Sequence, residues 1–318
     1  MFNNNSTLFH SGTTEEFVQQ SLYVGLGFIT VLSNIIIIFT VWKSGKFRLL
    51  GYLAAGDACY GGAFFTSGIG RLYYLSAGIY HLHRTRISCT LMPWFHLFAL
   101  GNFWPSIGTV AVCTDRALAV GLVFWYHKNW NSLQEARLVL LSSLILAVCV
   151  IPAYVLAITN PLGTLTEKQC SFSDIHALYA TFYSVFGVVC GIVSVAVNLY
   201  VLVAAKRQFA KLALAETDTY VQRQQGLTYS VSAIVTSTLA LVVIPRMSSA
   251  IIYSGSVPPV DEVFARWLIL VYLLNSTLPL FLYLRLNSEF LSLFYCYILR
   301  AQKYPAPVQP ILNSKAVS

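Results

Sequence analysis

The sequence predicts an all-α membrane protein: a seven-transmembrane helix bundle with a short amphipathic helix at its C-terminal end. The first observation is composition. Of 318 residues, 57% are hydrophobic and 10% are charged, whereas soluble domains carry about 25% charged residues. The second is a mean hydropathy of +0.66. The third is a series of seven apolar stretches, each long enough to supply the roughly 20 residues that a helix needs to cross a bilayer.

Composition also excludes other classes of protein. A chain with 19 Tyr, 20 Phe and 6 Trp carries too much apolar surface to remain intrinsically disordered. The net charge of +8 is divided into short basic pieces between apolar runs, so nucleic acid is not expected as a partner. None of the seven cysteines forms a CxxC pair, and neither a metal site nor a cofactor is expected.

Residues 1–21 are expected to form an extracellular tail. The tail contains no Lys or Arg, so it lacks the charged region that begins a cleavable signal peptide. Asn4 and Asn5 begin two overlapping Asn-x-Ser/Thr sequons, which are glycosylated only when the segment lies outside the cytosol. Chance occurrence of so short a motif is the alternative reading.

The transmembrane domain is expected at residues 22–285. Its spans are expected at 22–42, 49–79, 88–120, 137–160, 176–205, 227–254 and 262–285. An odd number of spans places the two termini on opposite sides of the membrane. Fourteen of the twenty Lys and Arg residues lie on one side and five on the other, with Arg246 inside a span. The positive-inside rule then places the N-terminus outside the plasma membrane and the C-terminus in the cytosol.

Few polar groups lie inside these spans, and an ionisable one is a functional hypothesis by default. Asp57 ends the run LAAGD in the second span and needs an internal partner or a bound cation there. Asn34 in the first span is the nearest candidate partner, and Asn275 and Ser276 in the seventh complete a polar cluster. The alternative is a protonated Asp57 that serves packing alone. Close helix approach is expected at six glycines of the second span: Gly51, Gly56, Gly61, Gly62, Gly68 and Gly70.

Asp115 and Arg116 stand at the cytosolic end of the third span. Arg116 lies 27 residues after Cys89, a helical length of about 40 Å, so Cys89 is expected on the outer side. Cys170 follows the fourth span and is also expected outside. The other five cysteines lie in spans or in the cytosolic helix. A disulfide between Cys89 and Cys170 is therefore the pairing that topology favours.

Residues 286–318 are expected to form a cytosolic helix and tail. The run from Asn287 to Arg300 has apolar residues at helical spacing but is too short to span. It is expected to lie on the inner leaflet as an amphipathic helix. Cys296 on this helix is either an acylation site or an unmodified buried thiol.

Several motifs together resemble a known family. They are the N-terminal sequon, Asn34, the LAAGD run that ends at Asp57, Cys89, the Asp115-Arg116 pair, Cys170, Pro245 and the NSTLP run that ends at Pro279. Over nearly the whole chain, this pattern is similar to that of rhodopsin-like (class A) G-protein-coupled receptors, and most of all to nematode serpentine chemoreceptors.

The resemblance implies a receptor that transmits binding of an extracellular small-molecule or peptide ligand to a heterotrimeric G protein. In that family the Asp-Arg pair holds the third helix inactive, and on activation the arginine contacts the G protein. Arg116 would carry that role here. The activation switch implied by the resemblance comprises Asp115, Arg116, Asn34, Asp57, Asn275, Pro279, Tyr283 and Tyr200.

The sequence departs from the family pattern at several positions. Ala117 replaces the usual aromatic residue after Asp-Arg, and Leu278 stands where the family has Asn before Pro279. Tyr283 falls one residue later than the family's tyrosine. No tryptophan precedes Pro245, so any toggle at that helix must use other residues.

A ligand pocket is expected between the outer halves of the helices. The candidate lining residues are His96, Phe98, Ala99, Asn102, Arg246, Phe264, Leu268 and Tyr272. Arg246 lies some eight residues below the outer end of its span, about 12 Å at helical rise, which is far for snorkelling. We expect it to pair with an anionic or carbonyl-bearing ligand. The alternative is an arginine paired to backbone carbonyls or to a neighbouring helix.

An enzyme is not expected, because the sequence contains no GxSxG, no HExxH and no phosphate-cradling glycine loop. A polytopic transporter or channel is the alternative to a receptor. Asp57 and Arg246 are charges inside spans, and such charges line ion paths in transport proteins.

Overall fold

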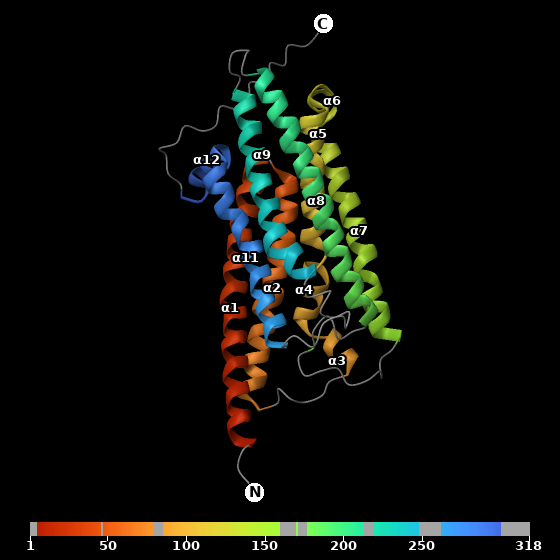
Figure 1. Cartoon of the computed structure of the whole chain (residues 1–318), viewed down its shortest axis with the longest axis vertical. Coiled ribbons are helices and arrows are strands. Elements are labelled where there is room, and N and C mark those ends of the chain that lie inside the picture. The colour runs from red at the N-terminus through yellow and green to blue at the C-terminus, as the bar shows by residue number, and fades with distance from the viewer. Residues whose placement is uncertain are drawn as a thin grey trace.

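The computed structural model describes residues 5–45, 47–78, 85–159, 170, 177–212, 219–247 and 262–299. Within these ranges the chain is helical and contains no strand. The long helices run roughly parallel and form one bundle (Figure 1). Four helices of the described part are long and apolar enough to cross a membrane, at Thr14–Ser44, Pro93–Gly121, Ser132–Thr159 and Thr181–Arg207. The chain therefore has the character of an all-α membrane protein.

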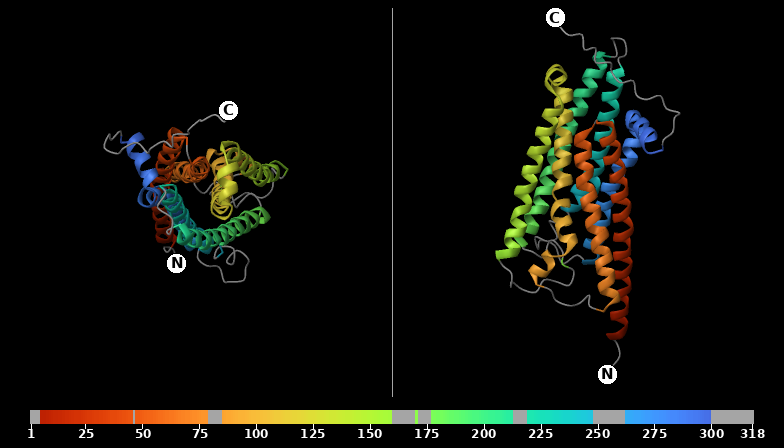
Figure 2. Two further views of the ribbon diagram at one scale, coloured as in Figure 1. Left: turned by 90° about the horizontal axis from the view of Figure 1, so that it is seen from above. Right: turned by 180° about the vertical axis from the view of Figure 1, so that it is seen from behind.

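Helices α1 (Asn5–Ser44) and α2 (Arg48–Ser76) lie side by side along the bundle (Figures 1 and 2). Glycines let their backbones meet, because a Cβ on Gly27 would lie 2.7 Å from the amide nitrogen of Phe65 and 2.8 Å from the carbonyl oxygen of Gly61. A second close approach lies nearer the N-terminal end of α1, where a Cβ on Gly68 would lie 2.9 Å from the carbonyl oxygen of Gln20. Two of the glycines expected to permit close approach, Gly61 and Gly68, belong to this contact.

Helix α1 begins at Asn5, well before residue 22, where the first span was expected to follow the N-terminal tail. The reason is packing beyond the apolar run. Tyr23 is buried, and its hydroxyl accepts a 2.7 Å hydrogen bond from Nε2 of Gln19, which is also buried. Polar residues of the expected tail thus take part in the contact with α2.

The third expected span, 88–120, consists of α3 (Arg86–Thr90), α4 (Pro93–Gly101) and α5 (Trp104–Gly121). The interruption between α4 and α5 falls at Asn102 and Phe103 and is followed by Pro105. Proline has no amide hydrogen to donate and its ring clashes with the carbonyl one turn earlier, so a straight helix cannot continue through this point. Phe103 is completely buried there and packs against Phe186, with ring centroids 5.5 Å apart.

Short helix α6 (Val123–Asn129) leads into α7 (Ser132–Thr159), and α8 (Ala177–Leu212) follows. Many large apolar side chains of α7 and α8 point outward. Those at least half exposed include Leu140, Leu144, Val148, Ile151, Ile158, Val189 and Ile192. Such an extensive apolar surface is costly in water and matches contact with lipid.

Helix α9 (Thr219–Thr238) passes into a π-helical turn, η2 (Leu239–Val243), and residues 244–247 continue it as helix. The wider turn directly precedes Pro245, and π turns are a common way for a helix to absorb an irregularity. Helix α11 (Glu262–Leu286) carries Pro279 and is followed by α12 (Ser288–Tyr297). Asn287 caps α12 by accepting a 3.0 Å hydrogen bond from the amide of Phe290.

Helix α12 turns away from the bundle axis beside α11 (Figure 1). Phe290 is fully buried and packs on Tyr283, with ring centroids 5.5 Å apart, whereas Cys296 is exposed. The helix is therefore amphipathic, as its sequence predicts, and Cys296 is not the buried thiol of the alternative reading.

The bundle has two distinct ends (Figure 1). Helix α3, with Cys89, lies at the end where α11 begins. Helix α6 lies at the opposite end, where α5 finishes with Asp115 and Arg116 on its last turns. Seen along the axis, the helices are arranged around a common centre (Figure 2).

Candidate functional site

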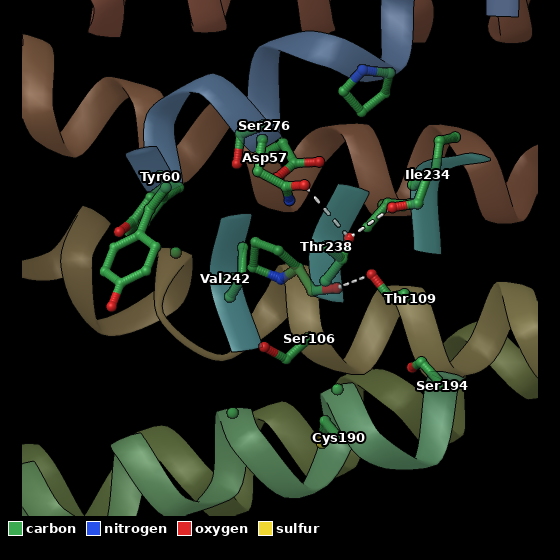
Figure 3. A pocket seen from close by; sticks show the side chains of 18 of the residues that line it. Asp57, Tyr60, Ser106, Thr109, Cys190, Ser194, Ile234, Thr238, Val242 and Ser276 are labelled. Atoms are coloured by element: carbon green, nitrogen blue, oxygen red, sulfur yellow. Dashed lines mark hydrogen bonds between the residues drawn. The ribbon is translucent and has the colours of Figure 1, made fainter. Parts of the chain in front are cut away.

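A small cavity of about 40 Å³ lies between the helices. Its walls are α2, the end of α4, α5, α8, α9 with η2 and residues 244–247, and α11. Figure 3 shows its lining, with Asp57 and Ser276 close together on one side and Cys190 on the other. The polar side chains of the lining are Asp57, Tyr60, Ser106, Thr109, Ser194, Thr238, Arg246, Tyr272, Asn275 and Ser276. By volume, the cavity holds a few water molecules or a small polar group.

Arg246 is buried at this cavity, with 7% of its surface exposed. Its guanidinium carbon lies 5.6 Å from the ring centre of Tyr183 and 5.7 Å from that of Tyr272. Aromatic faces attract cations at such distances, but they accept no conventional hydrogen bond from the guanidinium. Among the described residues, neither Nε nor Nη1 of Arg246 has a hydrogen-bond acceptor.

Two glycines on α8, one turn apart, make room for this side of the cavity. A Cβ on Gly187 would overlap Nη1 of Arg246, and a Cβ on Gly191 would overlap Cγ2 of Val243. The guanidinium therefore occupies space that any side chain at residue 187 would fill. The position of Arg246 depends on a glycine of another helix.

The Asp57 side of the cavity is a hydrogen-bonded polar cluster. The Asp57 carboxyl lies close to the side chain of Ser276 (Figure 3). Oδ1 of Asn275 accepts bonds from the hydroxyls of Ser237 at 3.2 Å and Thr238 at 3.5 Å, which join α11 to α9. The structure thus brings Asp57, Asn275 and Ser276 together, as the sequence predicts.

Asn34 takes a different partner from the one expected. Its Nδ2 donates 2.9 Å hydrogen bonds to the backbone oxygens of Thr30 and Ser276. Asn34 therefore fastens α1 to α11 next to the Asp57 cluster, and it contacts the backbone of Ser276 while Asp57 contacts the side chain. A carbonyl inside a helix accepts a second hydrogen bond readily because it has two lone pairs.

At the other end of the bundle, Asp115 and Arg116 form an ion pair. Nε of Arg116 donates a 2.9 Å hydrogen bond to Oδ2 of Asp115, and the hydroxyl of Tyr126 on α6 donates one of 2.9 Å to Oδ1. Asp115 is buried, so both of its oxygens are used in a protected site. Burial and the nearby Asp115 charge raise the pKa of Tyr126, which keeps its hydroxyl protonated and able to donate.

Three more residues of the expected switch take separate positions. Pro279 lines the cavity. Tyr283 is buried against α12 and not at the cavity. Tyr200 is 55% exposed. Its hydroxyl packs against Gly121 at the end of α5, where an added Cβ would lie only 2.6 Å from the hydroxyl oxygen.

Of the expected ligand-pocket residues, some line the cavity and others lie elsewhere. Arg246 and Tyr272 line the cavity. Phe98 instead packs edge-on against Phe64 at 4.8 Å, and exposed His96 is hydrogen-bonded to the hydroxyl of Tyr154 at 2.8 Å. Asn102 is buried at the interruption between α4 and α5, outside the lining. The side chains of Leu268 and Phe264 lie outside the described residues.

Sequence reasoning missed several lining residues, including Tyr60, Ser106, Thr109, Gly187 and Cys190. Ser106 and Thr109 lie on α5, beyond the interruption at Asn102, where an uninterrupted helical period no longer predicts which face points inward. Pro105 is the sequence signal that marks this change of direction.

Cys89 and Cys170 form a disulfide, as predicted, with their Cα atoms 5.2 Å apart and 81 residues between them in sequence. Both are buried. The bond fastens the segment after α7 to α3. Of the predicted glycosylation sites, Asn4 and the side chain of Asn5 lie outside the described residues.

No protein-family model matches the chain, and no curated protein matches it. Within the described residues, no three His, Cys, Asp or Glu side chains are grouped closely enough to hold a metal ion. The cavity offers one buried cation, one buried carboxyl group and several hydroxyls. This is chemistry suited to binding a polar solute.

Proposed function

We propose that the chain is a G-protein-coupled receptor of the rhodopsin-like kind, with a chemosensory role. It would cross the plasma membrane seven times, with the N-terminus outside and the C-terminus in the cytosol. A small ligand in the interhelical cavity would act on a heterotrimeric G protein at the opposite end of the bundle. The motifs that resemble this family support the proposal, and so does the arrangement of its two charged sites.

The observation that carries the proposal is the Asp115-Arg116 ion pair, held by Tyr126. An arginine at the end of a helix is engaged by a buried carboxylate, and that carboxylate is itself tied to the next helix. Such a pair has an engaged and a released arrangement, and only the released arginine is available to a protein partner. A two-state element of this kind is what a switch requires.

Seven spans would be formed by α1, α2, α4 with α5, α7, α8, α9 with η2, and α11. Apolar helix is present at Val231–Met247 and Leu270–Leu286, shorter than the four long candidates. Helix α2 packs against several neighbouring helices, and its charged residues Asp57 and Arg71 are buried within protein. A helix shielded from lipid can cross a membrane with polar residues facing the bundle interior.

The proposed mechanism is a shift between two arrangements of one bundle. Ligand in the cavity binds the active arrangement better, and so does the G protein at Arg116. Thermodynamic linkage then requires each to raise the affinity of the other. The cluster of Asp57, Asn275 and Ser276 lies in the cavity wall and joins α2, α9 and α11, which places it to respond to the ligand.

The experiment is G-protein nucleotide exchange with the purified receptor in lipid nanodiscs, measured against a panel of Gα subunits. Asp115→Asn removes the charge that holds Arg116, and we expect basal exchange to rise about tenfold, since a hydrogen bond to a charged group contributes about 1.5 kcal/mol. Arg116→Ala should abolish exchange. Arg137→Ala, an exposed basic residue at the same end, is the matched control. Exchange that is indifferent to both Asp115 and Arg116 would contradict the proposal.

A transporter or channel is the second candidate, because Asp57 and Arg246 line one cavity. Membrane topology separates the two. Glycosidase sensitivity of Asn4 and Asn5 reports the side of the N-terminus, and protease protection of a C-terminal tag reports the other end. Opposite sides agree with seven spans and a receptor. Both termini on one side mean an even number of spans, which contradicts the receptor and favours transport.

A further inference from the structure

Arg246 is a buried cation, and two of its three guanidinium nitrogens have no hydrogen-bond acceptor among the described residues. Only 7% of it is exposed, and neither Nε nor Nη1 has an acceptor among the described residues. Burying a charged donor without an acceptor costs several kcal/mol in general. The aromatic contacts with Tyr183 and Tyr272 offset part of this cost, but they leave the hydrogen-bonding capacity of the guanidinium unfilled. These two donors are therefore satisfied only when a group in the cavity accepts hydrogen bonds from them.

Charge in the cavity limits the charge of that occupant. Among the described lining residues, Arg246 is the basic one and Asp57 the acidic one. An anion at Arg246 thus meets a single positive charge, with an acid in the wall of the same cavity. A dianion such as a phosphate monoester would be left with an uncompensated charge in a protected site, whereas a monoanion balances Arg246 when Asp57 is protonated.

Shape and size limit its chemistry further. The cavity measures about 40 Å³, room for a few heavy atoms. Aromatic rings of Tyr183 and Tyr272 lie against the guanidinium, which favours contact along its planar edges. A planar carboxylate matches the edge of a guanidinium, with oxygen atoms at the spacing of its nitrogens.

One part of the lining next to Arg246 has room for a short hydrocarbon chain. Val242 and Cys190 contribute apolar surface, and Gly187 and Gly191 expose helix backbone there. These groups offer few hydrogen bonds to the far end of a ligand. The carboxylate is therefore the recognised group.

We propose that the cavity binds a small monocarboxylate, such as a short-chain organic acid, through Arg246. This inference rests on the proposed function in one respect: the carboxylate would be the ligand of the proposed receptor. The binding itself does not depend on a G protein, so the two ideas can fail separately.

The test is thermal unfolding of the purified full-length protein in detergent, and the quantity measured is the melting temperature. The probes are sodium acetate, propionate and butyrate, compared with acetamide, propionamide and butyramide, all at one ionic strength set with sodium chloride. We expect each carboxylate to raise the melting temperature in a saturable way, because a ligand that binds the folded state alone stabilises it. The amides, which have the same shape without the charge, should leave it unchanged.

Variants decide whether the effect belongs to Arg246. Arg246→Gln should abolish the carboxylate shift, and Arg246→Lys should weaken apparent affinity about tenfold, because a lysine keeps the charge but loses the planar fork. Gly187→Ala should also abolish the shift, since its methyl group takes the space of Nη1. The matched control is Arg71→Gln, a buried arginine on α2 outside the cavity lining, which should retain the shift.

If a variant does not fold, isotope-labelled acetate binding to the wild-type protein, competed by unlabelled carboxylates, gives a second measurement. Equal stabilisation by amides, equal stabilisation by chloride alone, or a shift that survives Arg246→Gln would overturn the inference. A carboxylate shift without any effect on nucleotide exchange would leave the binding site standing and contradict the proposed receptor function. Coupling to a G protein without a carboxylate shift would do the reverse.

Discussion

The hydroxyl of Tyr126 donates a 2.9 Å hydrogen bond to one carboxylate oxygen of Asp115, while Arg116 binds the other oxygen. One buried side chain thus connects the end of α5 to α6. Tyr126 also stacks on Trp130, with ring centroids 5.1 Å apart, so the ring stays in place whether or not its hydroxyl is bonded. The hydroxyl can therefore be tested apart from the ring.

Tyr126→Phe should raise basal nucleotide exchange about fivefold. The substitution removes one hydrogen-bond donor to Asp115, and a hydrogen bond of this kind contributes about 1 kcal/mol, so the pair with Arg116 opens more often. Tyr229→Phe, an exposed tyrosine on α9, is the control and should leave exchange unchanged. A rate for Tyr126→Phe equal to that of the wild type would mean that Tyr126 does not restrain the pair.

The same bond should show no pH step between pH 7 and 9. The folded protein raises the pKa of Tyr126 above the unfolded value of about 10, so the contribution of the bond is fully present below pH 10. It is lost only as pH rises through the folded pKa. Basal exchange of wild type and Tyr126→Phe, measured across this range, should therefore keep a constant ratio. A ratio that falls towards one by pH 9 would contradict this assignment.

Asn34→Ala should lower the melting temperature by about 3–6 °C. The amide of Asn34 donates to the backbone of Ser276, and losing a buried hydrogen bond between helices costs about 1–2 kcal/mol. Thermal unfolding measures the change. Ser76→Ala, an exposed serine at the end of α2, serves as the control. An unchanged melting temperature would show that the bond between α1 and α11 adds no stability.

Gly27→Ala should destabilise the protein by about 1–3 kcal/mol, the usual cost of overpacking a tight contact. Its new methyl group would meet the backbone of Phe65 and Gly61, which cannot move aside as a flexible side chain does. Gly25→Ala is a matched control two residues away on the same helix, with no atom within 4 Å of the added Cβ. That change should be neutral or stabilise by up to about 1 kcal/mol through helix propensity. Thermal unfolding of both variants should show opposite signs, and equal destabilisation would contradict the close contact.

Cys89→Ser should lower the melting temperature by about 5–10 °C, because a disulfide typically contributes about 2–4 kcal/mol. Cys296→Ser removes an exposed thiol outside any disulfide and should have no such effect. Peptide mapping without reduction should find Cys89 joined to Cys170 in the wild type. Recovery of Cys89 with a free thiol in protein kept under oxidising conditions would contradict the bond.

The sequence predicts the positions of the helices well, because the physical signal is strong. Apolar runs such as the one around Val148 need lipid or core contact wherever they lie. Asp57 and Arg246 are noticeable for the converse reason, since a charge inside a span needs a compensating environment. The compartment argument predicts the disulfide of Cys89 with Cys170, which the structure contains.

The contacts inside the bundle follow less directly from sequence. An uninterrupted helix would point His96 and Asn102 at the cavity, but the helix is interrupted before Pro105 and Ser106 takes that place. Gly187 has no side chain to suggest a role, although the absence of a Cβ there makes space for Nη1 of Arg246. The role of such a position depends on which side chain of another helix packs against it, and a single sequence does not show which helices are in contact.

The glycine contact between α1 and α2 also limits how these two helices can move past each other. Backbone lies on backbone at Gly27 and Gly61, so sliding one helix along the other would force carbonyls and amides into collision. The segment after α9, formed by η2 and residues 244–247, meets α8 differently. Its contact runs through the side chains of Val243 and Arg246, which lie over Gly191 and Gly187 and can change rotamer. We therefore expect α1 and α2 to resist sliding past each other more than α8 resists a shift of the segment formed by η2 and residues 244–247.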